Sequence, residues 1–331
     1  MNRIIKSNMG DLTSLVIAVK AGLFIFLIVS FQEAVDLPSS LLNLNTIFIS
    51  ILIEALPFVL IGVLIAGFIQ IFVTEDHIKK WIPKNKYLAI LMSCTAGALF
   101  PACECGIVPI IRRLVGKGVP IYAGIGFMLT GPLINPIVIA STYMAFGNDA
   151  KMAGLRMGLG FVIALASAFA VSLFFKGNQF KKGLHIESVQ SMSKAPFMDR
   201  LWSMLTHSID EFFDMAKYLI LGAFLASFVQ VYLPARTLLE AGSGPVASML
   251  VMMGLAFILS LCSEADAFIG ASFGSIFPPA SVLGFLIFGP MIDLKNTLMM
   301  LSVFRKRFVL SLLLIVAAAV FVTLLIVQGL W

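Results

Sequence analysis

The sequence predicts an all-α protein that crosses a membrane several times. It has about nine apolar segments, arranged as two inverted repeats that each contain a re-entrant or broken helix. Hydrophobic residues make up 60% of the 331 residues and charged residues 12%, and the mean hydropathy is +1.02. A soluble domain carries about 25% charged residues. Apolar runs such as 47–73 and 308–328 match the roughly 20 residues that a helix needs to cross a bilayer.

The apolar segments follow one another with mostly short polar connections. We expect them at 13–31, 44–73, 87–111, 118–146, 153–175, 210–234, 246–270, 276–304 and 308–330. No small-residue cleavage site follows the first segment, which favours a retained span over a removed signal peptide. The chain then divides into an N-terminal transmembrane segment with an outer loop, a first membrane repeat, a cytoplasmic linker and a second membrane repeat, at 1–43, 44–175, 176–209 and 210–331.

The two halves carry polar residues and helix breakers in the same order. The stretch "IEALPFVLIGVLIAGFIQIFV" at 53–73 aligns with "FDMAKYLILGAFLASFVQVYL" at 213–233. Farther along, "LFPACECGIV" aligns with "LSLCSEADAF", and "VPIYAGIGFMLTGPLIN" aligns with "FPPASVLGFLIFGPMID". Apolar composition explains the aliphatic matches but not the coincident glycines, prolines and acids. We therefore infer an internal repeat, a common plan in transporters.

Basic clusters determine the expected orientation, because cytoplasmic loops carry lysine and arginine. These clusters account for the net charge of +6, which therefore does not indicate nucleic-acid binding. If every segment crossed the membrane, the clusters at 112–117 and 176–200 would lie outside. If 87–111 and 246–270 instead enter and leave on the same side, every cluster lies inside and the halves are inverted. A broken spanning helix in each half is the alternative.

The stretch "FPACECGIVPI" places two thiols among helix breakers. Pro101 and Pro109 disfavour a continuous helix, and Gly106 tolerates strained dihedral angles. In an unwound segment, residues two apart project to the same side. Cys103 and Cys105 would then face one cavity, since irregular backbone at membrane depth is tolerated only inside protein or against water.

Three acids lie on the two repeat-equivalent segments: Glu104 on the first, and Glu264 and Asp266 on the second, beside Cys262. A charge at the bilayer centre costs at least about 2.5–3.5 kcal/mol, so such residues mark substrate or ion pathways. The alternative is that an acid lies at a helix end and stabilises the helix dipole.

A Gly-Pro pair precedes a polar residue by the same spacing in both halves. The residues are Gly131, Pro132 and Asn135 in the first half, and Gly289, Pro290 and Asp293 in the second. The pair should kink a helix and free main-chain carbonyls, with the polar side chain presented near the break. A plain kink with a hydrogen-bonded polar residue is the alternative.

The cysteines and the missing motifs restrict the chemistry. Cys94, outside the motif, is best explained as a small buried hydrophobic residue. Cys103 and Cys105, with or without Cys262, could bind soft ions or thiophilic centres. The chain has three histidines and no Walker, dinucleotide-binding or HExxH motif. We therefore expect no cofactor and no resident metal.

"PACECGIVPI", "GPLINP" and "LCSEADAFI" together resemble the bacterial permease family that includes the organoarsenical efflux permeases. The resemblance covers most of the chain from about Ile47 onward. It implies a multi-pass permease of the bacterial cytoplasmic membrane. For some members it implies export of trivalent methylated or aromatic arsenicals, with thiols binding the arsenic, although most members have no assigned substrate.

We expect a secondary transporter, not an enzyme, that exports a small solute bound between the two halves. Its partners would be that solute and membrane lipid, and not nucleic acid. The predicted substrate and transport residues are Cys103, Glu104, Cys105, Asn135, Cys262, Glu264, Asp266 and Asp293. Two alternatives stay open: a channel or one subunit of a multi-protein permease, with the chain pairing with itself or with another membrane subunit, and a membrane enzyme that uses the Cys-x-Cys pair in redox chemistry.

Overall fold

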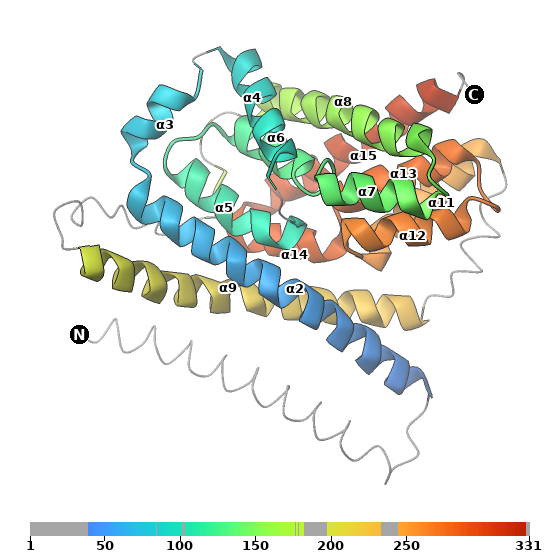
Figure 1. Ribbon diagram of the computed structural model, residues 1–331, viewed down its shortest axis with the longest axis horizontal. Helices are drawn as coiled ribbons and strands as arrows, with labels where there is room; N and C mark the ends of the chain where they lie inside the picture. The colour runs from blue at the N-terminus through green and yellow to red at the C-terminus, as the bar shows by residue number, and fades with distance from the viewer. Residues whose placement is uncertain are drawn as a thin grey trace, which may run out of the picture.

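Nearly every residue described in the structure is helical. The computed structural model describes residues 39–83, 85–100, 103–175, 177, 179–181, 197–232 and 244–328. The helices, labelled in Figure 1, are α2 Ser39–Phe72, α3 Glu75–Trp81, α4 Lys86–Ala98, α5 Glu104–Gly116, α6 Ile121–Thr130, α7 Pro136–Ala145, α8 Ala150–Phe174, α9 Phe197–Tyr232, α11 Pro245–Leu259, α12 Ser263–Phe273, α13 Pro279–Met291, α14 Leu294–Val303 and α15 Lys306–Gln328. In these ranges the β-structure consists of one isolated antiparallel bridge between Phe180 and Phe304.

Five stretches of the described chain are long and apolar enough to cross a membrane. They are α2, α8, α15, most of α9, and the run Pro279–Val303, which α13 and α14 share. The protein is therefore an all-α, multi-pass membrane protein. The first expected segment, 13–31, lies outside the described residues, as does most of the expected linker. The end of that linker, 197–209, is not a connection but the start of α9.

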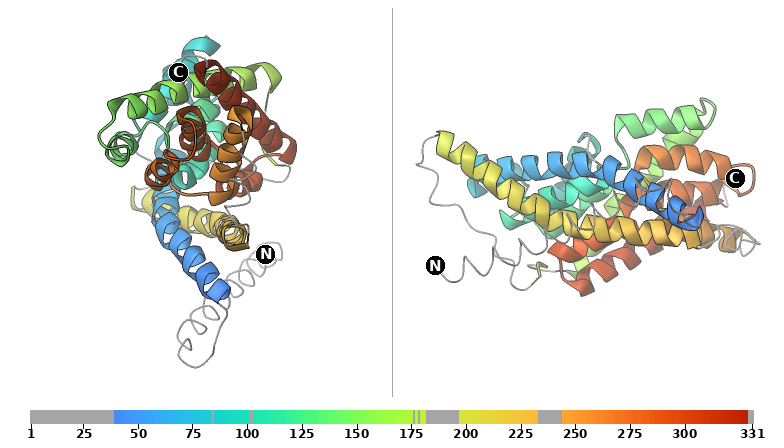
Figure 2. Two further views of the ribbon diagram at one scale, coloured as in Figure 1. Left: turned by 90° about the vertical axis from the view of Figure 1, so that its right-hand side faces the viewer. Right: turned by 90° about the horizontal axis from the view of Figure 1, so that it is seen from below.

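α2 and α9 lie side by side along one side of the bundle (Figures 1 and 2). They run antiparallel: the Ser208 hydroxyl donates to the carbonyl of Val63 at 3.2 Å, whereas the rings of Phe224 and Phe48 meet near the other end at 6.1 Å. Such close packing in a membrane depends on shape and interhelical hydrogen bonds, because lipid is as apolar as the side chains.

Basic side chains gather where α2 ends. The ammonium group of Lys117 donates to the carbonyls of Gln70 and Val73, and a guanidinium nitrogen of Arg200 donates to that of Ile71 at 3.1 Å. Cations are favourable at a helix C-terminus, where carbonyls lack helical donors. This end of α2 has the positive charge expected of a cytoplasmic face.

Four of the expected apolar segments consist of two short helices each. The breaks lie between α4 and α5, α6 and α7, α11 and α12, and α13 and α14. Gly131 and Pro132 lie in the second break, as predicted, whereas Pro101 lies outside the described residues. Gly106 and Pro109 do not break a helix, because both lie within α5. Gly289 and Pro290 likewise lie within α13, which continues to Met291.

Gly106 serves packing rather than unwinding. A Cβ atom on Gly62 of α2 would lie 2.3 Å from the carbonyl oxygen of Gly106, and one on Gly106 would lie 2.8 Å from that of Phe58. The two backbones can approach this closely because neither glycine has a side chain, as in many membrane helix pairs. The crossing brings α5 directly against α2.

α13 forms the centre of the core, since every residue from Ala280 to Met291 is buried. Its apolar sequence on all sides fits a helix surrounded by protein. α11, α12 and α15 pack around it, while α4, α5 and α8 pack around α6 in the first half. Two contacts join the halves near the breaks: α5 packs against α14, and α7 against α12.

Candidate functional site

The helix breaks place the predicted polar residues at helix N-termini. Cys103 is the N-terminal cap of α5 and Cys262 that of α12, both in extended conformation. Glu104 therefore lies in the first turn of α5, and Glu264 and Asp266 lie in the first turn of α12. Carboxylates in this position are stabilised by the unpaired N–H groups and the dipole of the helix.

Asn135 and Asp293 cap the other two half-helices. The Asn135 side chain accepts a hydrogen bond from the N–H of Ile137 at 3.0 Å, at the start of α7. Asp293 does the same for α14, where its Oδ1 accepts from the N–H of Asn296 at 2.5 Å. Both residues are therefore hydrogen-bonded helix caps, and the second oxygen of Asp293 stays available for other contacts.

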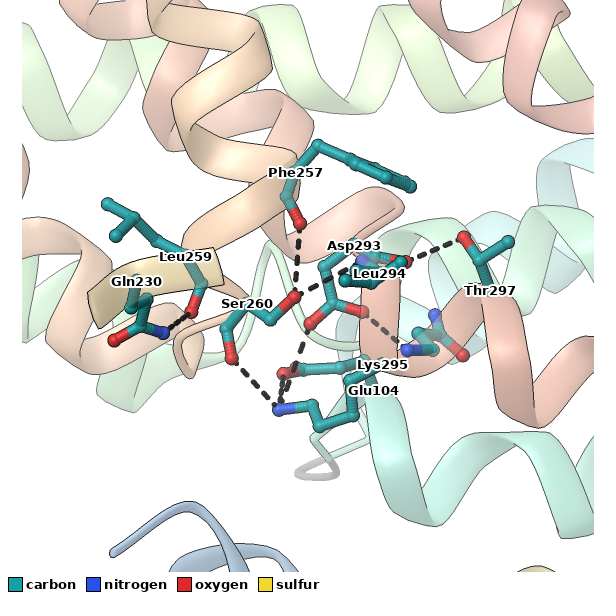
Figure 3. A network of polar contacts seen from close by, with 10 residues as sticks. Glu104, Gln230, Phe257, Leu259, Ser260, Asp293, Leu294, Lys295 and Thr297 are labelled. Atoms are coloured by element: carbon teal, nitrogen blue, oxygen red, sulfur yellow. Dashed lines mark hydrogen bonds and ion pairs between the residues drawn. The ribbon is translucent and has the colours of Figure 1, made fainter. Parts of the chain in front are cut away.

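Lys295 lies at the centre of a buried group of charges, which we call the carboxylate–lysine cluster: Glu104, Asp293, Lys295 and the main-chain carbonyl of Ser260 (Figure 3). The Lys295 ammonium nitrogen is 3.4 Å from Glu104 Oε1, 3.8 Å from Asp293 Oδ2 and 3.3 Å from the Ser260 oxygen. The side chains of Glu104, Asp293 and Lys295 are 5% exposed or less. Charge-assisted hydrogen bonds are usually about 2.7–2.9 Å long, so the ammonium is held loosely among three oxygens.

The break after α11 supports this cluster. Ser260 has a left-handed backbone (φ 48°), which turns its carbonyl toward Lys295. Its hydroxyl accepts from the N–H of Leu294 at 3.2 Å and donates to the carbonyl of Phe257 at 3.0 Å. The amide of Gln230 on α9 donates to the carbonyl of Leu259 at 2.6 Å. The end of α11 is thus attached to both α14 and α9.

Several polar atoms in and near the cluster are buried without a hydrogen-bond partner in the described part of the chain. They are Glu104 Oε2, Asp293 Oδ2, Asn296 Oδ1, Asp266 Oδ2 and Ser263 Oγ. An unpaired buried acceptor costs about 1–3 kcal/mol, and more for a charged group. So many orphan oxygens in one region are unusual for a protein interior, where such groups are normally paired, and indicate a functional region.

A second buried cation, Arg156 on α8, connects the halves. Its guanidinium donates to Thr142 Oγ1 at 2.6 Å, to the carbonyl of Ser263 at 3.0 Å and to that of Leu286 at 3.1 Å. Leu286 lies four residues before Pro290, which has no N–H to donate to it. Arg156 therefore supplies the donor that the proline removes, and α13 remains helical through Pro290.

Asp266 lies between the two cations. Its carboxylate interacts electrostatically with Arg156, with Lys295 and with Glu104. A Cβ atom on Gly289 would lie 3.0 Å from Asp266 Oδ2, so the glycine allows α13 to approach this carboxylate. Glu264 is only half-buried and interacts with Glu104. The structure thus brings the three predicted acids into one region.

The thiols divide into separate environments. The side chains of Cys103 and Cys105 interact with each other and lie near Lys295. The Cys262 side chain interacts with Glu54 of α2 and, more weakly, with Glu104. Cys94 is fully buried in a small apolar cluster with Ile90 and Ala168. Among the described residues, no group of three or more His, Cys, Asp or Glu side chains is arranged to hold a metal ion.

Sequence reasoning missed the buried cations Lys295 and Arg156. Lys295 follows Asp293 by two positions and Arg156 lies in an expected apolar segment, so each was an intramembrane charge of the kind that marks a functional site. In the sequence, Glu54 stands out only because it aligns with Asp214 in the repeat. Ser260 gave no usable signal, because its contribution is a main-chain carbonyl whose direction depends on the fold.

Several long apolar helices, interrupted by breaks that carry buried charges, define a multi-pass membrane protein of the permease class. The chain belongs to the "predicted permease" family ArsP_1, whose model matches residues 40–329. UPF0718 protein YcgR of Bacillus subtilis is 52% identical over 291 residues, which cover 88% of this chain and 99% of that protein.

Two further relatives broaden the comparison. A Streptococcus mutans protein, named as a subunit of a two-component membrane permease complex, is 43% identical over 275 residues, covering 83% of this chain and 91% of that protein. UPF0718 protein MJ0584 of Methanocaldococcus jannaschii is 24% identical over 168 residues, or 49% of this chain and 46% of that protein. No solved structure shows a significant match to the chain.

Proposed function

We propose that this permease is a secondary transporter that exports a small solute across the bacterial cytoplasmic membrane. The observation that carries the proposal is the carboxylate–lysine cluster, in which incompletely paired charges are buried at the breaks of membrane helices. Intramembrane charges of this kind are costly and are retained for substrate or ion movement. The predicted site residues Cys103, Glu104, Cys105, Asn135, Cys262, Glu264, Asp266 and Asp293 are assigned to this pathway as part of the proposal.

The transporter would work through two inverted halves. The matched caps support this: Cys103 corresponds to Cys262, and Asn135 corresponds to Asp293, at equivalent helix starts. Transporters of this plan bind solutes at discontinuous helices near the bilayer midplane, where half-helix ends face the site. Relative movement at the α5–α14 and α7–α12 contacts would expose the cluster alternately to the two sides.

The substrate class follows from the thiols. Cys103 and Cys105 interact beside Lys295 and Glu104, where a soft, electrophilic centre would meet both thiols at once. Together with the resemblance to organoarsenical efflux permeases, this favours a thiophilic compound such as a trivalent organoarsenical. Cys262, which interacts with both Glu54 and Glu104, would give the solute a further thiol contact.

A resistance and accumulation screen tests the function directly. Cells with and without the gene are exposed to trivalent organoarsenicals, soft metal ions and sulfur oxyanions. We expect lower accumulation of one class in cells that carry the gene. Equal accumulation of every compound would contradict export of a thiophilic solute.

Proteoliposome flux of the compound so identified tests the site. Cys103→Ser and Glu104→Gln should abolish transport, and Glu264→Gln should do the same, while the protein elutes as a folded species. Cys94→Ala is the matched control, since this thiol is buried away from the cluster and its loss should leave transport intact. Unchanged flux in the three site variants would overturn the assignment.

A second arrangement is one subunit of a two-component permease, favoured by the name of the Streptococcus mutans relative, which spans most of this chain. In that case the chain would need another membrane protein for activity. Affinity purification from the native membrane, followed by counting of the subunits, distinguishes the two. Flux from the purified single chain in proteoliposomes would show that no partner is required.

A further inference from the structure

We propose that the carboxylate–lysine cluster is a monovalent-cation site filled by the protein's own cation, the ammonium group of Lys295. Any use of this site in transport rests on the proposed function, whereas the occupancy of the site by the Lys295 ammonium does not. In this arrangement the wild-type protein needs no alkali cation in the carboxylate–lysine cluster. A variant with a shortened side chain at position 295 would bind sodium in its place.

The ligands around the ammonium are those of an alkali-cation site. Glu104 provides a carboxylate oxygen, Asp293 provides another, and Ser260 provides a main-chain carbonyl, all within 3.8 Å of the nitrogen. They come from the start of α5, the start of α14 and the end of α11. Unwound carbonyls and half-helix ends that surround a cation are a recurrent feature of transporter breaks.

The hydrogen-bond pattern shows that the ammonium does not saturate these oxygens. Its contacts with Glu104 and Asp293 are longer than direct charge-assisted bonds. Among the residues that the structure describes, Glu104 Oε2 and Asp293 Oδ2 are buried with no hydrogen-bond partner, as is Asn296 Oδ1 one residue beyond Lys295. These hard oxygen atoms are ligands that a compact cation could share.

The charge balance selects a monovalent ion. Two carboxylates face one ammonium within the cluster. Asp266 does not change this balance, because Arg156 is the cation that interacts with it most strongly, ahead of Lys295. Replacing Lys295 by a neutral residue removes one positive charge, which Na⁺ restores without altering the neighbouring groups. Oxygen donors of this kind suit hard ions rather than the soft ions that thiolates prefer.

Thermal unfolding of the purified full-length chain in detergent tests the proposal without any transport assay. Unfolding is followed with a thiol-reactive dye that labels the native cysteines as they become accessible. Lys295→Ala is compared with wild type in 150 mM NaCl and in 150 mM choline chloride. We expect sodium to raise the melting temperature of Lys295→Ala by about 2–4 °C, from the stabilisation that a weakly bound ligand gives, and to leave wild type within about 1 °C.

Two controls identify the site. In Lys295→Ala/Asp293→Asn the sodium effect should disappear, while asparagine retains the oxygen that caps α14. Lys217→Ala removes another lysine of the membrane region, one that contacts Asp214 at 3.0 Å on the outside of α9, and should show no sodium effect. A sodium effect of equal size in wild type or in Lys217→Ala would overturn the proposal, as would stabilisation of Lys295→Ala by Ca²⁺ but not by Na⁺.

If Lys295→Ala is recovered folded only in sodium, the proposal is supported directly. If it is not recovered in either salt, Lys295→Met is compared with Lys295→Met/Glu104→Gln. The double variant should melt higher than the single one, because it no longer buries an uncompensated second carboxylate. A double variant that melts at or below the single variant contradicts the role of Lys295 as the cation of the site. Loss of transport in these variants bears only on the proposed function.

Discussion

Arg113 contacts Glu211 through two guanidinium nitrogens, which lie 2.9 and 2.7 Å from the same carboxylate oxygen. Arg112 reaches the other oxygen of Glu211 at 3.3 Å. This buried triad attaches the end of α5 to α9, and α5 in turn begins at the carboxylate–lysine cluster. The position of Glu104 therefore depends on an ion pair at the opposite end of the same helix.

Removing the shared carboxylate should destabilise the protein strongly. We expect Glu211→Gln to lower the free energy of unfolding by about 3 kcal/mol, because two guanidinium groups lose their counter-charge inside the protein. Denaturation in mixed micelles measures the change. Asp214→Asn is the comparison at an exposed ion pair, since the Asp214 side chain is 58% exposed beside Lys217. This variant should lower the free energy of unfolding by less than about 1 kcal/mol. Similar losses in both variants would contradict the prediction.

Arg156 and Pro290 should be energetically coupled. We expect Arg156→Met to cost about 2–3 kcal/mol, since the Leu286 and Ser263 carbonyls lose their buried donor. Pro290→Ala restores an N–H for Leu286, so it should recover about 1 kcal/mol in the Arg156→Met background and little in wild type. Wild type, the two single variants and the double variant, compared by their denaturation midpoints, give the coupling energy. Additive effects would show that Arg156 does not compensate for the proline.

The close crossing of α2 and α5 predicts a position-specific effect of alanine. Gly62→Ala should lower the melting temperature by several degrees, because the new methyl group meets the main chain of Gly106 and the helices must separate. Gly254→Ala in α11 is the control: among the described residues, no atom beyond its own stretch of helix lies within 4 Å of the added Cβ, so the variant should be neutral or slightly stabilising. Equal shifts in the two variants would rule out the packing explanation.

Asp293 combines two roles that a pair of substitutions can separate. Asp293→Asn retains an oxygen for the N–H of Asn296 but removes the charge that faces Lys295, so we expect a folded protein with impaired transport. Asp293→Ala loses the cap as well and should be about 1 kcal/mol less stable than Asp293→Asn. Melting temperatures and proteoliposome flux are measured on both. Full transport by Asp293→Asn would show that the capping role is sufficient.

The all-α membrane fold could be predicted because apolar runs of membrane length are visible residue by residue. The positions of the helix breaks were harder to predict from the sequence. The sequence predicts Gly106 and Gly289 as helix breakers, but each lies inside a helix where another group comes close: the main chain of Gly62 and the carboxylate of Asp266. The residues in such contacts are far apart in the sequence. A glycine that breaks a helix therefore cannot be distinguished, from the sequence, from one that makes room for a neighbouring helix.

The acids and thiols of the candidate site could be named from the sequence because residue type alone makes them unusual in an apolar segment. Their arrangement could not. The nearest cation to Glu104 is Lys295, from the other half of the chain, and the donor for Leu286 is Arg156, from α8. These pairings depend on how the helices pack, and the contribution of Ser260 depends on a single left-handed residue.

Glu104 of the first half pairs with Lys295 of the second, and Glu211 of the second half pairs with Arg112 and Arg113 of the first, so neither half of the chain contains all of its own charge partners. The first half synthesised alone would leave Glu104 without the lysine that pairs with it, and the second half alone would leave Glu211 without its two arginines. The first half can therefore complete its folding only after the second half has been inserted. Two fragments divided between α8 and α9 would become functional only by reassociating, so co-expressed fragments should restore activity where either alone does not.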